Sequence, residues 1–156
     1  MTTDQEKLAF KQQLKQWGLD LIGRRIATSN EAMTQAQEAA NNEEKSSAGD
    51  KYETGRAMGH LQKEMHARQL SESVKELATL HAIPTEPLCH EGRPGAYLQA
   101  EGFAFFISAG LGKQVIDGQT VVFLSPQAPL AGLLQGKKAG DQVAFNKTTV
   151  TIREVF

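Results

Sequence analysis

The N-terminal half of the chain carries apolar and small side chains at alternating steps of three and four residues. This spacing is typical of the seam of a coiled coil. In the first run Leu14, Trp17 and Leu21 come first, and the alternating steps then pass through Ile22, Ile26, Ser29, Met33, Ala36 and Ala40. The second run is Tyr52, Gly55, Met58, Leu61, Met65, Leu70, Val74 and Leu77, with one irregular step before Leu70. The pattern predicts two long helices, each with one stripe facing the other.

The boundaries of the two helices have their own signals. Thr3 and Glu6 fit a capping box that begins the first helix, and Ser47 with Asp50 fits a second one. Residues 41–49 carry no large apolar side chain and are typical of a turn. We therefore expect an antiparallel coiled-coil hairpin over residues 1–82, with its tip at about 41–50. A first helix of about 38 residues would be about 57 Å long.

The seam residues become smaller toward the predicted turn. Ala36 and Ala40 lie on one side, and Gly55 and Gly59 lie on the other. Small side chains let two helix backbones approach closely, so we expect a slender end. A long structural arm that dimerises with another arm is the simpler alternative.

The composition changes at residues 83–87, which we interpret as a linker. All five prolines lie between Pro84 and Pro129, whereas residues 1–81 contain none. Proline restricts the residue before it and cannot continue a helix. Residues 88–156 hold six of the seven phenylalanines and the β-branched runs. They predict a separate C-terminal domain rich in β-strands.

Six strands and one helix are expected in this second domain. The strands are Ala96–Ala100, Phe103–Ser108, Lys113–Ile116, Thr120–Leu124, Gln142–Phe145 and Thr148–Glu154. Asp117-Gly118 is a strong hairpin-turn signal. Residues 126–135 predict a short helix with Ser125 as N-cap, Pro126 at its first position and Gly136 at its end. The overall class is therefore α+β.

Charge and cysteine content exclude several classes of protein. The formal net charge is −1, so no global basic field attracts nucleic acid. A single cysteine excludes an internal disulfide framework and a zinc site built from cysteines. No apolar run is long enough for a membrane span, and the polar start lacks the apolar core of a signal peptide. We expect a cytoplasmic protein with no membrane partner.

The predicted tip is rich in acids. Residues 38–53 hold five acidic side chains, Glu38, Glu43, Glu44, Asp50 and Glu53, against two lysines. Carboxylates are the hard oxygen ligands that Mg²⁺ prefers. The alternative is that these acids solvate an exposed turn and favour the start of the second helix through its dipole.

The C-terminal half resembles a known family. Residues 125–130 read Ser-Pro-Gln-Ala-Pro-Leu, and residues 136–143 read Gly-Lys-Lys-Ala-Gly-Asp-Gln-Val. This order is similar to the C-terminal signature of the Gre-type transcript cleavage factors, and the order of the two halves is similar as well. The resemblance implies an FKBP-like fold for the C-terminal domain.

The resemblance also implies a function in transcription elongation. Such a factor binds RNA polymerase at its secondary channel and directs acids on its tip to a second Mg²⁺ at the polymerase active site. That metal activates water, which cleaves backtracked RNA. The protein would not be an enzyme in isolation and would need no cofactor of its own. It would meet RNA and DNA only within the elongation complex, as a monomer.

The tip departs from the family pattern. If Tyr52 matches the tyrosine of the family's tip, the two acidic positions fall on Lys45 and Ala48. The candidate catalytic and Mg²⁺-binding residues, acting in trans, are then Asp50, Glu43 and Glu44. The candidate partner-binding residues are Lys45, Ser46, Ser47, Arg56, Ser125 and Pro126. Three alternatives stay open: a channel-binding inhibitor without cleavage activity, an FKBP-like peptidyl-prolyl isomerase or chaperone, and a coiled-coil adaptor.

Overall fold

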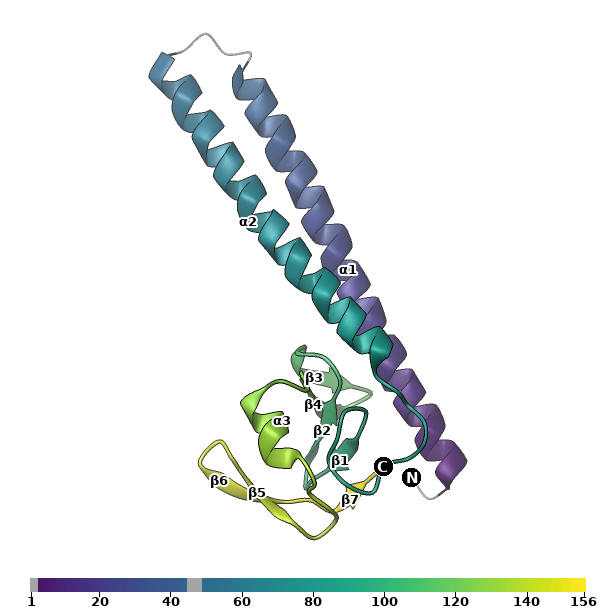
Figure 1. The fold of residues 1–156 in the computed structure, drawn as a ribbon. Helices are drawn as coiled ribbons and strands as arrows, with labels where there is room; N and C mark the ends of the chain where they lie inside the picture. The colour runs from purple at the N-terminus through teal and green to yellow at the C-terminus, as the bar shows by residue number, and fades with distance from the viewer. Residues whose placement is uncertain (1–2, 45–48) are drawn as a thin grey trace. The chain divides into compact units, whose positions relative to one another are not determined.

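The computed structural model describes the backbone of residues 3–44 and 49–156, and the side chains of residues 3–42, 55 and 57–156. Two long helices come first, α1 (Asp4–Glu44) and α2 (Gly49–Ala82). A set of short strands and one short helix, α3 (Pro129–Leu134), follows them (Figure 1). A helical hairpin followed by a small sheet with one helix confirms the predicted α+β class. No helix in the described part of the chain is long and apolar enough to cross a membrane.

The contacts divide the chain into two compact units. Unit 1 comprises residues 1–19 and 78–156, and unit 2 comprises residues 20–77. Unit 1 therefore contains the start of α1 and the end of α2 in addition to the strands. The predicted domain bounds, which follow the change of element type at residues 83–87, stay a prediction.

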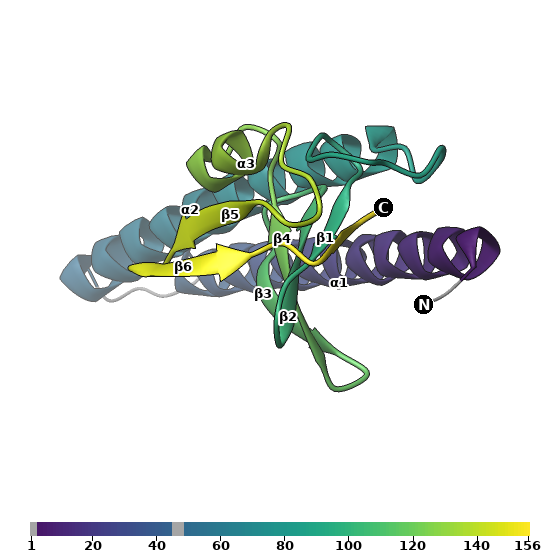
Figure 2. The same ribbon diagram turned by 90° about the horizontal axis from the view of Figure 1, so that it is seen from below.

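Unit 1 is built on a five-stranded sheet in the order β3-β4-β2-β1-β7. Its strands are β1 (Tyr97–Gln99), β2 (Phe103–Ile107), β3 (Gly112–Ile116), β4 (Gln119–Leu124) and β7 (Glu154–Val155). Strands β2 and β4 pair in parallel, and the other pairs are antiparallel. A separate hairpin joins β5 (Gln142–Phe145) to β6 (Thr148–Thr151), as Figure 2 shows.

Strand β2 is buried on both faces, which explains its nearly continuous apolar sequence. On one face Phe105 and Ile107 join a core with residues of α3, β5 and the segment before β7, among them Leu134. On the other face Phe106 packs against Phe123, with ring centroids 5.7 Å apart. Because side chains alternate along a strand, these two layers use alternate residues.

The start of α1 packs on that second layer. Phe10 meets Tyr97 edge to face at 5.1 Å between ring centroids, and Trp17 stacks on Phe123 at 5.7 Å. The periodic pattern placed Trp17 on the apolar side of the first helix, and at this position that side packs on the sheet. The Trp17 indole packs on Phe123 of β4, because a large flat ring gains contact area and a stacking interaction there.

Within unit 2 the predicted seam is correct for α1. Ile22, Ser29, Ala36 and Ala40 are all buried. The spacing of three and four residues along this helix therefore identified the buried stripe.

The predicted seam is wrong for much of α2. Met58, Leu61 and Met65 are 58%, 61% and 46% exposed. The buried positions are Gly59, which we expected in the seam, and Ser73, which lies next to the expected Val74. One residue along a helix is a rotation of about 100°, so this offset moves the larger side chains out of the seam.

The close approach of the backbones explains the offset. A Cβ atom on Gly59 would lie only 2.9 Å from the Cβ of Ala40. A methionine in that place would force the helices apart. One turn further along α2, Lys63 donates a hydrogen bond to Gln37 Oε1 at 2.7 Å. The hairpin is therefore joined by small and polar side chains.

The element ends follow the sequence signals in part. The amide of Glu6 donates to Thr3 Oγ1 at 3.1 Å, which confirms Thr3 as a cap. Asp117 and Gly118 both have positive φ, as the expected tight turn requires. Gly136, with φ of 76°, follows α3 as expected.

Three boundaries differ from the prediction. Helix α1 continues to Glu44, so residues 41–44 are helical and not part of a turn. Helix α3 begins at Pro129 with Ala128 as N-cap, not at Pro126 with Ser125 as N-cap. The expected last strand is divided into β6 and β7, because the chain changes its partner after Ile152: the Ile152 amide still donates to Asp141 next to β5, whereas the Arg153 amide donates to the carbonyl of Gln99 in β1 at 2.7 Å.

Candidate functional site

The predicted tip residues lie outside the side chains that the structure describes. These residues are Glu43, Glu44, Lys45, Ser46, Ser47, Asp50 and Arg56. Their roles as Mg²⁺ ligands or partner contacts stay predictions. Among the side chains that are described, no three histidine, cysteine, aspartate or glutamate residues gather as a metal site.

Ser125 and Pro126, the remaining predicted partner contacts, lie in a turn between β4 and α3. Ser125 Oγ accepts a hydrogen bond from the amide of Gln127 at 3.2 Å, and its carbonyl accepts from Ala128 at 3.0 Å. This arrangement is a local turn built by a serine side chain. Both residues are partly buried, so they keep some surface that a partner can touch.

The second part of the family-like motif also forms turns. Asp141 Oδ2 accepts from the amide of Lys138 at 2.8 Å. Gly140 has φ of 94°, and its amide donates to the carbonyl of Ile152 at 2.7 Å. Such a φ is easy for glycine and strained for other residues. In the described structure these motif residues position β5 and the end of the chain, which is a structural role.

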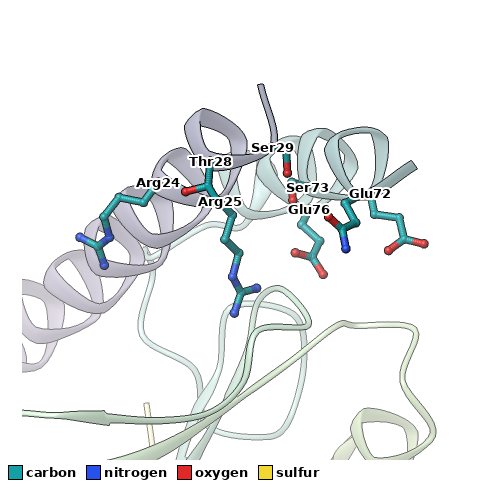
Figure 3. A pocket seen from close by; sticks show the side chains of 8 residues that line it. Arg24, Arg25, Thr28, Ser29, Glu72, Ser73 and Glu76 are labelled. Carbon is teal, nitrogen blue, oxygen red and sulfur yellow. The ribbon is translucent and has the colours of Figure 1, made fainter. Parts of the chain in front are cut away.

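A charged cleft lies between the two helices of unit 2 (Figure 3). It has a volume of about 430 Å³, and its lining residues are Arg24, Arg25, Thr28, Ser29, Gln69, Glu72, Ser73 and Glu76. Ser29 and Ser73 are its buried members, one from each helix. Two small hydroxyl side chains at seam positions leave room that a leucine pair would fill.

The charges of the cleft are mixed. Figure 3 shows Arg25 of α1 and Glu76 of α2 projecting to the same side. Burial raises the pKa of Glu76; the charge of Arg25 opposes this shift and the charge of Glu72 adds to it. A cleft with two guanidinium groups, two carboxylates and several hydroxyls can hydrogen-bond a polar segment of a partner. It offers no nucleophile paired with a base, so we assign it no reaction.

Sequence reasoning missed this cleft. The one signal was Ser29, a polar residue at a position where the seam pattern places apolar side chains. Its partner Ser73 was not identified, because the expected stripe on α2 passed through Val74. Because the expected stripe on α2 lay one residue away from Ser73, the sequence pattern did not indicate the cleft.

Comparisons with known proteins give only a distant structural likeness. No family model matches the chain, and no curated protein matches it. Among solved structures the chain is similar to the transcription factor Gfh1, with a TM-score of 0.38 and 14% sequence identity. The likeness covers 88% of this chain and 92% of that one.

Proposed function

We propose that this protein is a Gre-like transcription factor that binds RNA polymerase at its secondary channel. The proposal rests on the chain's own residues. The observation that carries it is the hairpin of two long helices, of 41 and 34 residues, followed by a β unit that holds the motif similar to the Gre signature. A 41-residue helix is about 60 Å long. A long narrow helical hairpin is the kind of element that can enter a channel closed to a globular domain.

The seam of unit 2 supports this role. Ala36, Ala40 and Gly59 are buried, and the space between their helices has no room for one more methyl group at Gly59. Close backbones make the hairpin thin. A hairpin of ordinary leucine packing would hold its helices further apart, since interaxial distance follows the size of the contacting side chains.

The tip would then act on polymerase catalysis. Asp50, with Glu43 or Glu44, would help to hold a second Mg²⁺ at the polymerase active site, where the metal activates water for cleavage of the transcript. The chain would supply the carboxylates, and the polymerase would supply the rest of the site. We therefore propose no enzymatic activity for the protein alone.

Binding to core RNA polymerase is the first test. The full chain, tagged and purified, should retain core polymerase in a pull-down and saturate in a titration. Absence of binding at micromolar concentration would refute the proposal. The coiled-coil adaptor and the isomerase hypotheses both predict that outcome.

Cleavage of backtracked transcripts is the second test. At a saturating concentration of factor, wild type should accelerate Mg²⁺-dependent cleavage, and Asp50→Asn should lose the effect while still binding. Glu31→Gln, on α1 and outside the acidic tip, is the matched control and should behave as wild type. If wild type binds and slows elongation without cleavage, the factor is a channel-binding inhibitor.

A further inference from the structure

Lys11 is a buried lysine in unit 1. Its side chain is 0% exposed, although lysine is among the residues that are almost never fully buried without a partner. Within the described part of the chain, its hydrogen-bonding contact is the sulfur of Cys89, at 3.9 Å from Nζ. A sulfur atom is a weak acceptor, so this contact offsets little of the cost of burial.

Cys89 lies in the loop before β1 and is 4% exposed. Arg93 Nε donates to its sulfur at 3.3 Å, so two cationic side chains face one sulfur atom. The chain has a single cysteine, and no second thiol of the chain can form a disulfide with it. The Lys11 amine, 3.9 Å from the sulfur, is therefore a side-chain nucleophile placed beside an oxidised Cys89.

A cavity lies against Cys89. Its volume is about 440 Å³, and Cys89 forms part of its wall together with Lys7, Leu8 and His90. Hydrogen peroxide is close to water in size, and a space of about 30 Å³ holds one water molecule. Cys89 is thus too little exposed for large reagents, and it borders a space that a small oxidant can enter.

We propose that oxidation by a peroxide joins Lys11 Nζ covalently to Cys89 Sγ. In the first step the thiol sulfur attacks one peroxide oxygen, an S–O bond forms and the O–O bond breaks; the thiol proton passes to the departing oxygen, so that water leaves and a sulfenic acid remains. In the second step the amine attacks the sulfur, an S–N bond forms, the S–O bond breaks, and a second water carries away the oxygen and a proton from nitrogen. Sulfur loses two electrons, one peroxide gains them, and the product is a sulfenamide.

The state of the amine favours the second step. Burial lowers the pKa of Lys11, and this effect outweighs the opposing influence of Cys89. A neutral amine is the nucleophilic form, so burial increases the fraction of Lys11 that can react. The crosslink connects positions 78 residues apart in the sequence and holds α1 to the loop before β1. It goes beyond the proposed role on RNA polymerase and does not depend on it.

The test is mass spectrometry of the full chain after treatment with hydrogen peroxide. The expected product loses two hydrogen atoms, about 2 Da, whereas oxidation to sulfinic acid gains about 32 Da. Proteolytic digestion should give one joined peptide containing Lys11 and Cys89, and dithiothreitol should release it. This measurement on wild type needs no variant to fold.

Variants identify the reacting pair. Lys11→Met and Cys89→Ser should abolish the joined peptide, and Lys7→Met, one turn earlier on α1, should keep it. The proposal is overturned if wild type gives only sulfinic acid or remains unmodified, or if Lys11→Met still forms the crosslink. A joined peptide that retains one oxygen atom would overturn the condensation step.

Discussion

Replacing Gly59 by alanine tests the close packing of the hairpin against a matched control. In a helix interior, alanine is more favourable than glycine by about 1 kcal/mol. Gly23, in α1 of the same unit, has no atom within 4 Å of the place where a Cβ would be. Gly23→Ala should therefore raise the free energy of unfolding by about 1 kcal/mol.

Gly59→Ala should behave differently. Its new methyl group would lie 2.9 Å from Ala40 Cβ and 3.4 Å from Ala40 Cα. Both atoms are fixed to the helix backbone, so no side-chain rotation relieves the contact, and the helices must move. Overpacking of this kind costs about 1–3 kcal/mol. Because the helix preference is the same at both sites, the difference between the two variants isolates this cost.

Urea unfolding followed by far-ultraviolet circular dichroism measures both free energies. Gly59→Ala should be about 1–3 kcal/mol less stable than Gly23→Ala. Adding Ala40→Gly to Gly59→Ala removes the opposing methyl group and should recover most of the overpacking cost. In a double-mutant cycle this recovery appears as a coupling energy between the two positions. If Gly59→Ala is as stabilising as Gly23→Ala, the helices are not in contact at this position.

Three further predictions follow from individual contacts. Folding raises the pKa of Glu76 above its ordinary value of 4.5, so the free energy of unfolding of wild type should fall as the pH rises from that value through the folded pKa. Urea titrations at several pH values should show a weaker pH dependence for Glu76→Gln. The same pH dependence in both proteins would contradict this prediction. Asp141→Ala leaves the amide of Lys138 without its acceptor and should lower the free energy of unfolding by about 1 kcal/mol, whereas an unaltered midpoint would exclude a role for that bond. Leu14→Ala opens a cavity at a side chain that is 1% exposed and should cost about 3 kcal/mol. Its unfolding can be followed by the fluorescence of Trp17, and a loss well below 1 kcal/mol would argue against close packing there.

The sequence predicted the strands of unit 1 well, because their signals are local. Runs of aromatic and β-branched residues end at glycine-containing turns, and Asp117-Gly118 places β3 opposite β4. The division of the last strand was missed. It depends on the change of partner from β5 to β1, where the Arg153 amide donates to the carbonyl of Gln99, a long-range contact that no strand pattern contains.

The prediction of the buried stripe on α2 failed for a different reason. The prediction assumed that the larger apolar side chains of α2 are buried, and so it placed Met58, Leu61 and Met65 in the seam together with Gly59. In this hairpin the distance between the helix backbones selects for small side chains, and that distance is a property of both helices together. The same limit applies to the candidate site: a cleft between Ser29 and Ser73 requires the rotation of α2 to be known first.

Unit 1 is assembled from two separated parts of the sequence, and this has a consequence for the order of folding. Phe10 packs near Phe156 at 6.3 Å between ring centroids, and Lys7 pairs with Glu154 at 2.9 Å. On the ribosome residues 20–77 are synthesised before 78–156, so the helical unit can close while the first turns of α1 still lack their β partners. Contacts of such long sequence separation form late and slowly. Until the β-strands are synthesised, Phe10 and Trp17 at the start of α1 lack their packing partners, so this segment is the one that we expect a chaperone to bind on the nascent chain.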